Sequence, residues 1–445
     1  MGNSRLTIVN VRLPLADERL YYTLRAEGGR WTEVAAQDGY LERSEPYAPF
    51  DAEGAVRAEC LDAEGKVALP GFADVHMHLD KAFSLPKVGN VSGTLGEAIA
   101  NYAASAGTFS KEEILSRIMK TALQAVSYGT SAIRTHLDFH AAAGRRVALQ
   151  SVEAALEAKE RLAPYLELQI FPMFSYRSST ASDVELFEEA LRMGVTGVGG
   201  APHIADEPER NIDLIFSLAE KFDRPIDLHT DETDDPEMKT VLYIADKTTA
   251  SGYGGRVTVD HLCSLASMPP AEAASVIARM AEAKLSAVTL PAANLYLQGR
   301  GDSAAVRRGV TRVKELAAAG IPIATASDNV HDPFHPFGRG DMLQIALITA
   351  YGAHMGAPSD LRLLLRMATE IPASIMGLRG YGIAAGNAAD LVLLDAVTPD
   401  ELFTKLPDRR WIYRAGRWLK FAPPEAGWEV PELGEQWTAY RRYGL

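Results

Sequence analysis

The sequence predicts an α/β protein made of a (β/α)8 TIM barrel and a second, small β-sandwich domain built from both chain ends. Through the middle of the chain, eight short apolar runs alternate with longer amphipathic segments, which is the pattern of a closed parallel barrel. Short β-like runs separated by turns occur at both ends. The length of 445 residues suits a barrel of roughly 250 residues or more with a smaller partner domain.

The predicted barrel strands are short apolar runs, rich in β-branched residues, that end in polar residues. They are 68–78, 130–139, 166–174, 195–204, 225–232, 255–263, 285–293 and 321–329. The segments between them have apolar residues at helical spacing. The clearest of these segments are 111–129, 145–162, 184–194 and 211–222. In such a barrel the carboxyl ends of all strands meet at one rim, where active sites lie.

The two chain ends together predict the small domain. A small antiparallel sheet is predicted by three N-terminal β-like runs, 6–14, 21–29 and 54–66. Two further β-like runs occur near the C-terminus, at 382–396 and 409–421. We therefore assign 1–65 and 380–425 to the small domain and 66–379 to the barrel. Residues 426–445 are rich in proline and aromatic side chains. We expect them to form a C-terminal arm that packs on this domain or on a neighbouring subunit.

Composition narrows the class of protein. The chain is 47% hydrophobic and 23% charged, which favours a folded protein with a large core. Its net charge of -13 argues against nucleic acid or an anionic membrane as partner. The first residues lack the apolar run of a signal peptide, and the two cysteines lie far apart. We expect a cytoplasmic protein that forms a homo-oligomer and acts on a small molecule.

His76 and His78 stand at the end of the first predicted barrel strand. Residues two apart on a strand point to the same face, so these imidazoles project together and form half of a metal site. His229 ends the fifth strand and Asp328 ends the eighth. Three imidazoles and one carboxylate at one rim suit Zn²⁺ or Fe²⁺, with an open position for water. We predict one divalent metal ion per subunit, since the fourth strand has no lysine that could bridge two.

Histidines gather at this rim. His136, His140, His203 and His261 also lie at or just beyond strand ends. A metal at this rim would bring the pKa of bound water toward about 7, and Asp328 could accept the proton. Asp328 could instead serve only as a turn cap.

Two further residues are predicted to be catalytic. Glu232, three residues after His229, can reach over the metal and act as a general acid/base. Alternatively, Glu232 could belong to an acidic loop that is only exposed to solvent and has no catalytic role. His261, at the end of the sixth strand, could orient the water or the attacked group.

The chain resembles the amidohydrolase superfamily, and within it the bacterial cytosine deaminase group. The resemblance rests on PGFADVHMHLDK, IRTHLDF, GGAPHI, DLHTDETDD, SDNVHDPFHPFG and YGIAAGNAADLVLL, spread over nearly the whole chain. It implies metal ligands at His76, His78, His229 and Asp328, a proton-shuttling Glu232 and an active-site His261. It also implies that a metal-bound hydroxide attacks a cyclic amidine in an N-heterocycle, such as a pyrimidine-, purine- or triazine-like ring, and that ammonia leaves.

Three positions depart from the cytosine deaminase pattern. Met173 stands where that group has a glutamine that reads the pyrimidine edge, Asn329 replaces an aspartate, and Phe334 replaces a tryptophan. The thioether of a methionine cannot both donate and accept a hydrogen bond, as a glutamine amide does when it pairs with the N–H and C=O of a pyrimidine ring. We therefore expect Met173, His261, Asn329 and Phe334 to bind a ring other than cytosine, although Met173 could also be a core residue below the pocket.

Two other functions stay open. HLDKAF and DPFHPFGRGDM are also similar to a branch that removes N-alkylamino groups from triazine rings, although that branch lacks a glutamate matching Glu232. The same fold could thus cleave another C–N bond, in an alkylamino group or a cyclic amide. A scaffold without catalysis is disfavoured because the chain keeps a full set of metal ligands.

Overall fold

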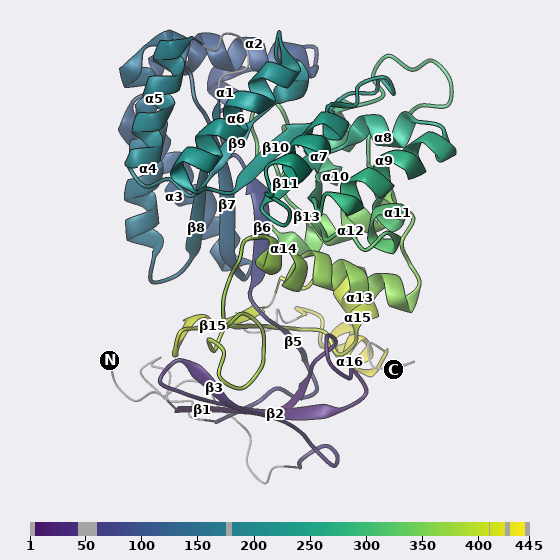
Figure 1. Cartoon of the computed structure of the whole chain (residues 1–445). Coiled ribbons are helices and arrows are strands. Elements are labelled where there is room, and N and C mark those ends of the chain that lie inside the picture. The colour runs from purple at the N-terminus through teal and green to yellow at the C-terminus, as the bar shows by residue number, and fades with distance from the viewer. Residues whose placement is uncertain (1–4, 43–59, 175–179, 409, 423–427, 441–445) are drawn as a thin grey trace.

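The structure, a computed structural model, describes residues 5–42, 60–174, 180–408, 410–422 and 428–440. These residues form an eight-stranded parallel barrel wrapped by helices, and a second eight-stranded sheet that lies below it (Figure 1). The predicted fold class is confirmed.

Each barrel strand is hydrogen-bonded to the next strand in chain order. The strands are β6 (Phe72–Met77), β7 (Thr130–Asp138), β8 (Glu167–Phe174), β9 (Val198–Gly200), β10 (Ile226–Thr230), β11 (Val257–His261), β12 (Ser286–Thr289) and β13 (Ile323–Thr325). The barrel closes where Met77 at the end of β6 bridges to Asp328 just beyond β13. All eight predicted strands are present, each shorter than the run that predicted it.

Helices connect the strands and cover the outside of the barrel (Figure 1). They are α1 (Leu85–Val88), α2 (Leu95–Ser105), α3 (Lys111–Ser127), α4 (Arg145–Leu162), α5 (Ala181–Arg192), α6 (Pro208–Phe222), α7 (Thr240–Ala250), α8 (Cys263–Ser267), α9 (Pro270–Glu282), α10 (Pro291–Leu297), α11 (Val313–Ala318), α12 (Met342–Gly352), α13 (Pro358–Met367) and α14 (Glu370–Ile375). Three short 3₁₀ turns add to them: η1 (Ala106–Thr108), η2 (Ala141–Ala143) and η3 (Pro202–Ile204).

Helix α3 shows how the sequence determines such an element. The Ser110 side chain caps its first turn by accepting a hydrogen bond from the Glu113 amide, 3.2 Å away. Ile114, Ile118 and Ala122 recur at helical spacing and are buried in the core shared with the barrel. The polar face is left to solvent.

The second sheet draws strands from both chain ends, as predicted. It contains β1 (Arg5–Arg12), β2 (Tyr21–Glu27), β3 (Arg30–Ala36), β4 (Cys60–Asp62), β5 (Val67–Leu69), β14 (Leu391–Leu394), β15 (Arg410–Arg414) and β16 (Arg417–Lys420). One core cluster joins Ile8 and Leu24 from one half with Leu391 and Tyr413 from the other, so the two halves of this sheet enclose its core.

The structure changes three details of the predicted small domain. Strands β4 and β5 pair with β1 in parallel, so the N-terminal part is mixed rather than antiparallel. Strand β5 belongs to this sheet, which therefore reaches past residue 65, and only Pro70 and Gly71 separate β5 from β6. Helix α15 (Pro399–Lys405) lies between β14 and β15, and helix α16 (Pro431–Tyr440) lies within the predicted arm. The packing of that arm on a domain or subunit stays a prediction.

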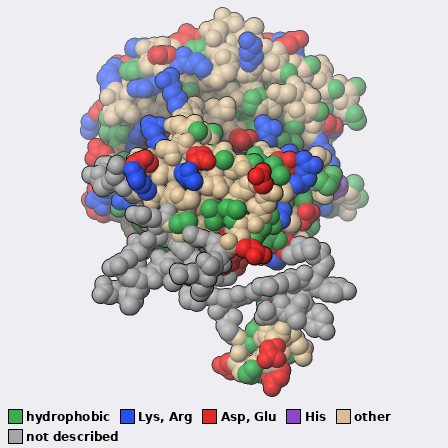
Figure 2. Space-filling model, turned by 90° about the horizontal axis from the view of Figure 1, so that it is seen from below, with side chains coloured by type: hydrophobic (Ala, Val, Ile, Leu, Met, Phe, Trp, Pro, Cys, Tyr) green, Lys and Arg blue, Asp and Glu red, His purple; other side chains and the backbone are tan. Residues whose placement is uncertain are grey.

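The face seen in Figure 2 carries acidic and basic side chains interspersed, with hydrophobic side chains between them. Its described part therefore lacks a continuous basic surface. None of the helices in the described ranges has the length and apolar character needed to cross a bilayer.

A buried ion pair fastens the small sheet to the barrel. Arg410 of β15 makes two hydrogen bonds to Asp341, at 2.8 and 2.9 Å, and both side chains are fully buried. Asp341 also caps α12 through the Leu343 amide. Arg410 further donates to the Tyr128 carbonyl at the end of α3. One guanidinium thus joins two helices of the barrel, α3 and α12, to the second sheet.

We expect Arg410→Met to destabilise the protein by about 3 kcal/mol, because it removes the fully buried partner of Asp341 and leaves that carboxylate with only the partly exposed Arg339, 2.6 Å away. Arg5→Met is the control, since it removes a solvent-exposed pair with Glu27 that is worth less than about 1 kcal/mol. Urea unfolding of the two variants beside the wild type measures both. Equal losses would show that the buried pair does not hold the two sheets together.

Candidate metal centre and active site

Closure of the barrel brings three predicted ligands together. The Asp328 amide donates to the His76 carbonyl at 2.9 Å, so the eighth strand end lies beside the first. Oδ1 of Asp328 lies 3.6 Å from Nε2 of His76 and 3.4 Å from Nε2 of His78. All three side chains are buried. Asp328 has φ +61°, a left-handed conformation uncommon outside glycine, and it turns the chain at this point.

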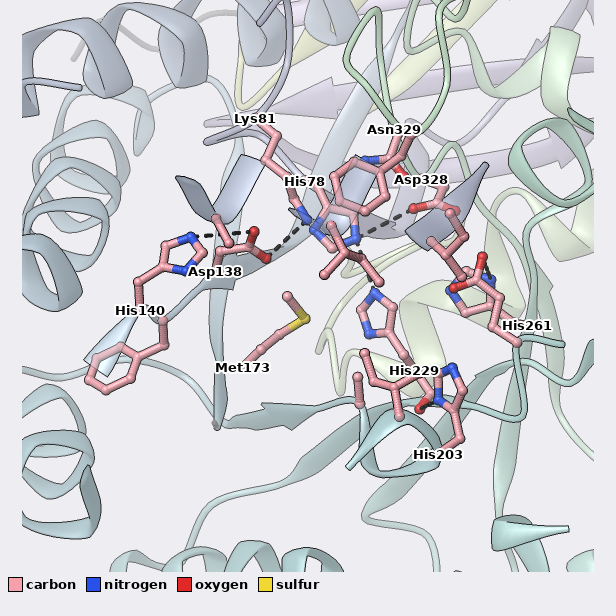
Figure 3. A pocket seen from close by; sticks show the side chains of 18 of the residues that line it. His78, Lys81, Asp138, His140, Met173, His203, His229, His261, Asp328 and Asn329 are labelled. Atoms are coloured by element: carbon pink, nitrogen blue, oxygen red, sulfur yellow. Dashed lines mark hydrogen bonds and ion pairs between the residues drawn. The ribbon is translucent and has the colours of Figure 1, made fainter. Parts of the chain in front are cut away.

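His229 reaches the same place from the opposite side of the barrel. On β10, Ile226 and Leu228 pack outward into the core beneath the helices, so Asp227 and His229 point inward. Nε2 of His229 lies 3.0 Å from Nε2 of His78. The structure thus brings together the four residues predicted to bind the metal, and Figure 3 labels three of them, His78, His229 and Asp328.

The chemistry of this cluster fits a divalent cation. His76, His78 and Asp328 each offer a ligand atom within 4.8 Å of the others, and so do His76, His229 and His261. Nε2 of His76 and Oδ1 of Asp328 are buried and make no hydrogen bond with the described residues. Burial lowers the pKa of His76, His78 and His229, which leaves their nitrogen lone pairs available as ligands.

A polar layer lies beneath this cluster and was not assigned from the sequence. Nδ1 of His76 is 2.8 Å from Oδ2 of Asp260, and His136 stacks on His76 with ring centroids 4.1 Å apart. Asp227 is paired with Arg134. Since Asp260 and Asp227 already have these partners, we interpret the layer as support that fixes the His76 ring and its tautomer. The alternation along VTVDH could have indicated Asp260, because Val257 and Val259 face outward.

His261 is oriented by Asn294, a second residue missed from the sequence. The Asn294 amide nitrogen lies 3.0 Å from Nδ1 of His261 and donates to it, so the ring proton resides on Nε2. Nε2 is buried and unpartnered among the described residues. His261 has φ +65°. That turn at the strand end directs its ring to the site, although alternation along β11 would place it outside.

Glu232 lies beside His261, with Oε1 3.3 Å from Nδ1 of that ring and 3.4 Å from the Asn294 amide nitrogen. It is buried, and burial raises its pKa to about 8. A carboxyl with that pKa holds a proton at neutral pH, as a general acid requires. Burial likewise raises the pKa of Asp328 to about 7.

A cavity of about 240 Å³ opens over these residues. The predicted substrate-binding residues Met173, His261, Asn329 and Phe334 all line it, together with Glu232 (Figure 3). The Asn329 amide donates to Oδ2 of Asp332 at 2.7 Å, so it is already held in place. Met173 is 9% exposed and faces the cavity from the end of β8.

Known proteins share this architecture and sequence. Residues 113–415, more than half of the chain, match the Amidohydrolase family, and the chain belongs to that family. It is 31% identical over 425 residues to a pterin deaminase of Rhizobium rhizogenes, covering 95% of both chains. It is 32% identical over 376 residues to the N-isopropylammelide isopropyl amidohydrolase of a Pseudomonas species, covering 82% of this chain and 88% of that one.

Among solved structures, the chain is similar to 5-methylcytosine deaminase from Klebsiella pneumoniae, crystallised with 5-fluorocytosine. The TM-score is 0.86 and the identity 29%, over 96% of this chain and 100% of that one. The resemblance read from the sequence is thus confirmed, and the protein is a deaminase-like hydrolase of C–N bonds.

We expect the purified protein to contain one divalent metal per chain and His229→Ala to lose most of it, because that variant removes one of four converging ligands. His140→Ala, which also alters a cavity histidine but lies outside the cluster, should retain the metal. Elemental analysis gives the metal content of each. Two tightly bound ions per wild-type chain would contradict a mononuclear site.

Proposed function

We propose that the protein is a metal-dependent aminohydrolase that deaminates a cyclic amidine in an N-heterocycle and releases ammonia. The observation that carries this proposal is the position of Glu232, which is buried on the wall of the cavity beside the metal cluster, with Oε1 3.3 Å from Nδ1 of His261. The similarity of the chain to proteins named pterin deaminase and 5-methylcytosine deaminase also supports hydrolytic deamination.

A divalent ion, Zn²⁺ or Fe²⁺, held by His76, His78, His229 and Asp328 would supply activation of a water molecule at neutral pH. The protein's own residues then move protons and orient the ring. Asp328 lines the cavity and is placed to accept a proton there. Glu232 donates its proton to the ring nitrogen and, after regaining one, to the departing amine.

His261 orients the reacting group. Because Asn294 donates to Nδ1, the Nε2–H of His261 is the donor that faces the cavity. Such a preset donor can bind developing negative charge on an oxygen without reorganising in the transition state. Asn294 contacts Glu232 as well, so one amide aligns both the acid and the donor.

A second function, removal of an alkylamino group from a triazine-like ring, is favoured by the 32% identity to the N-isopropylammelide isopropyl amidohydrolase. Glu232 argues for deamination, because the sequence branch that removes alkylamino groups lacks a matching glutamate. A screen of aminated pyrimidines, purines, triazines and pterins separates the two. Ammonia release supports our proposal, and release of an alkylamine alone overturns it. Cytoplasmic location and homo-oligomeric assembly stay predictions.

We expect Glu232→Gln to lower kcat by at least about a hundredfold with metal content unchanged, because it removes the titrating proton and keeps the shape. Glu237→Gln is the control, since Glu237 follows on the same loop and is solvent-exposed. Steady-state ammonia release and elemental analysis measure both effects. A nearly normal kcat in Glu232→Gln would assign the proton shuttle to another residue, with His261 the first to test.

We also expect the wild type to be poor on cytosine and Met173→Gln to raise kcat/KM for cytosine relative to the best substrate. Met173 has no group that can hydrogen-bond to the amide edge of a cytosine ring. Leaving that edge buried and unpaired can lower kcat/KM for cytosine by several orders of magnitude relative to a ring that the site accommodates. Met193→Gln, a change at the end of helix α5, is the control. If the wild type already turns over cytosine efficiently, Met173 does not set the choice of ring, and Asn329 or Phe334 becomes the candidate.

A further inference from the structure

Lys81 is a buried lysine on the cavity wall that the proposed chemistry does not use. It follows His78 by three residues and is only 3% exposed, yet its side chain lines the cavity (Figure 3). Its ammonium lies 2.9 Å from Oδ1 of Asp138. It also stands over the Phe334 ring, 4.3 Å from the centroid.

The surroundings keep Lys81 charged. Burial alone would lower its pKa, but the carboxylates of Asp138, Asp80 and Asp332 more than offset this, so the pKa lies above its ordinary value. An ammonium has three N–H donors. Among the described residues, Asp138 accepts one hydrogen bond from it, which leaves donors for a ligand in the cavity.

Structural stability does not explain this arrangement. A buried ion pair is weak evidence for stability, because the desolvation of both charges offsets their attraction. Lys81 and Asp138 are also flanked by a buried histidine nitrogen, Nε2 of His140, which has no hydrogen-bond partner among the described residues. A polar wall with unused hydrogen-bonding capacity facing a cavity is what a ligand-binding edge requires.

The barrel places this wall opposite the catalytic one. Lys81 follows the first barrel strand, β6, and Asp138 ends the second, β7. Glu232 follows the fifth, β10, and His261 ends the sixth, β11. In an eight-stranded barrel the first and fifth strands, and the second and sixth, lie across from each other. A ring whose amidine meets Glu232 and His261 therefore presents its far edge to Lys81.

We propose that Lys81, held by Asp138, binds an exocyclic oxo oxygen on the half of the substrate ring turned away from the departing amine. The inference rests on the proposed function and deepens it, since it names the side chain that would pair an oxo group of the ring. Lys81 is then a specificity-determining residue. The aromatic ring of Phe334 beneath it keeps the ammonium directed at the cavity.

The test compares two matched pairs of rings, pterin with 2-aminopteridine and isocytosine with 2-aminopyrimidine, which differ in the oxo group and in the ring N–H that accompanies it. We expect the metal-loaded wild type to prefer the oxo member of the pair it accepts by at least about a hundredfold in kcat/KM, as sites built to pair a polar group do. Lys81→Met should reduce that preference to under about tenfold, because the larger loss of kcat/KM falls on the ring that carries the oxo group. Lys87→Met, an exposed lysine on helix α1, is the control and should preserve the preference.

Equal loss on both members of a pair would show that Lys81 is merely structural, and an unchanged preference would show that it does not contact the oxo group. If Lys81→Met does not fold, the double variant Lys81→Met/Asp138→Leu removes both charges together and takes its place. If no ring releases ammonia from the wild type, the proposed function fails separately. Calorimetric binding of the same four rings then still tests Lys81, and equal affinity for both members of each pair would overturn its role.

Discussion

The backbone hydrogen bonds that close the barrel are the interaction on which the site depends. They run between the end of β6 and the segment after β13, and they join the Asp328 amide to the His76 carbonyl. Asp328 lies about 250 residues along the chain from the two histidines, and this closure brings them into contact. Forming the barrel and assembling the metal cluster are therefore the same event, and the cluster needs little further ordering.

Repulsion between buried groups is the main difficulty that this architecture has to resolve. The barrel interior holds three carboxyls, of Asp227, Asp260 and Asp328, close to several imidazoles. Burial raises the pKa of all three carboxyls, which shows that their charged forms are poorly solvated there. Arg134 compensates for part of this charge through Asp227 and packs on Phe171 at 4.4 Å. A divalent cation would compensate for much of the rest, so metal binding and folding should support one another.

The sequence predicted the elements well because each depends on local periodicity. The eight strands follow from short apolar runs, and the H-x-H spacing placed His76 and His78 on one face. Asp260 and Asn294 were missed because their roles arise from contacts across the barrel that no local pattern encodes. The left-handed turn at His261 reverses the direction expected from strand alternation, and a sequence does not display φ angles at a residue other than glycine or asparagine.

Domain boundaries were also less predictable than strands. The run 68–78 resembles one continuous strand, but Pro70 and Gly71 divide it between two sheets. Gly71 leaves no space for a side chain, since a Cβ would lie 2.6 Å from Cβ of Ser131, and its carbonyl accepts a hydrogen bond from the Tyr381 hydroxyl at 2.5 Å. This close packing fixes the junction.

The short junction between β5 and β6 has a mechanical consequence. Strand β6, which carries His76, directly continues strand β5 of the other sheet. A hinge motion between the two sheets would therefore displace a metal ligand. Domain rotation is thus unsuited to admitting a substrate. A substrate instead enters through the cavity that opens over the site at the opposite rim of the barrel, while the second sheet holds the strand that carries His76 in place.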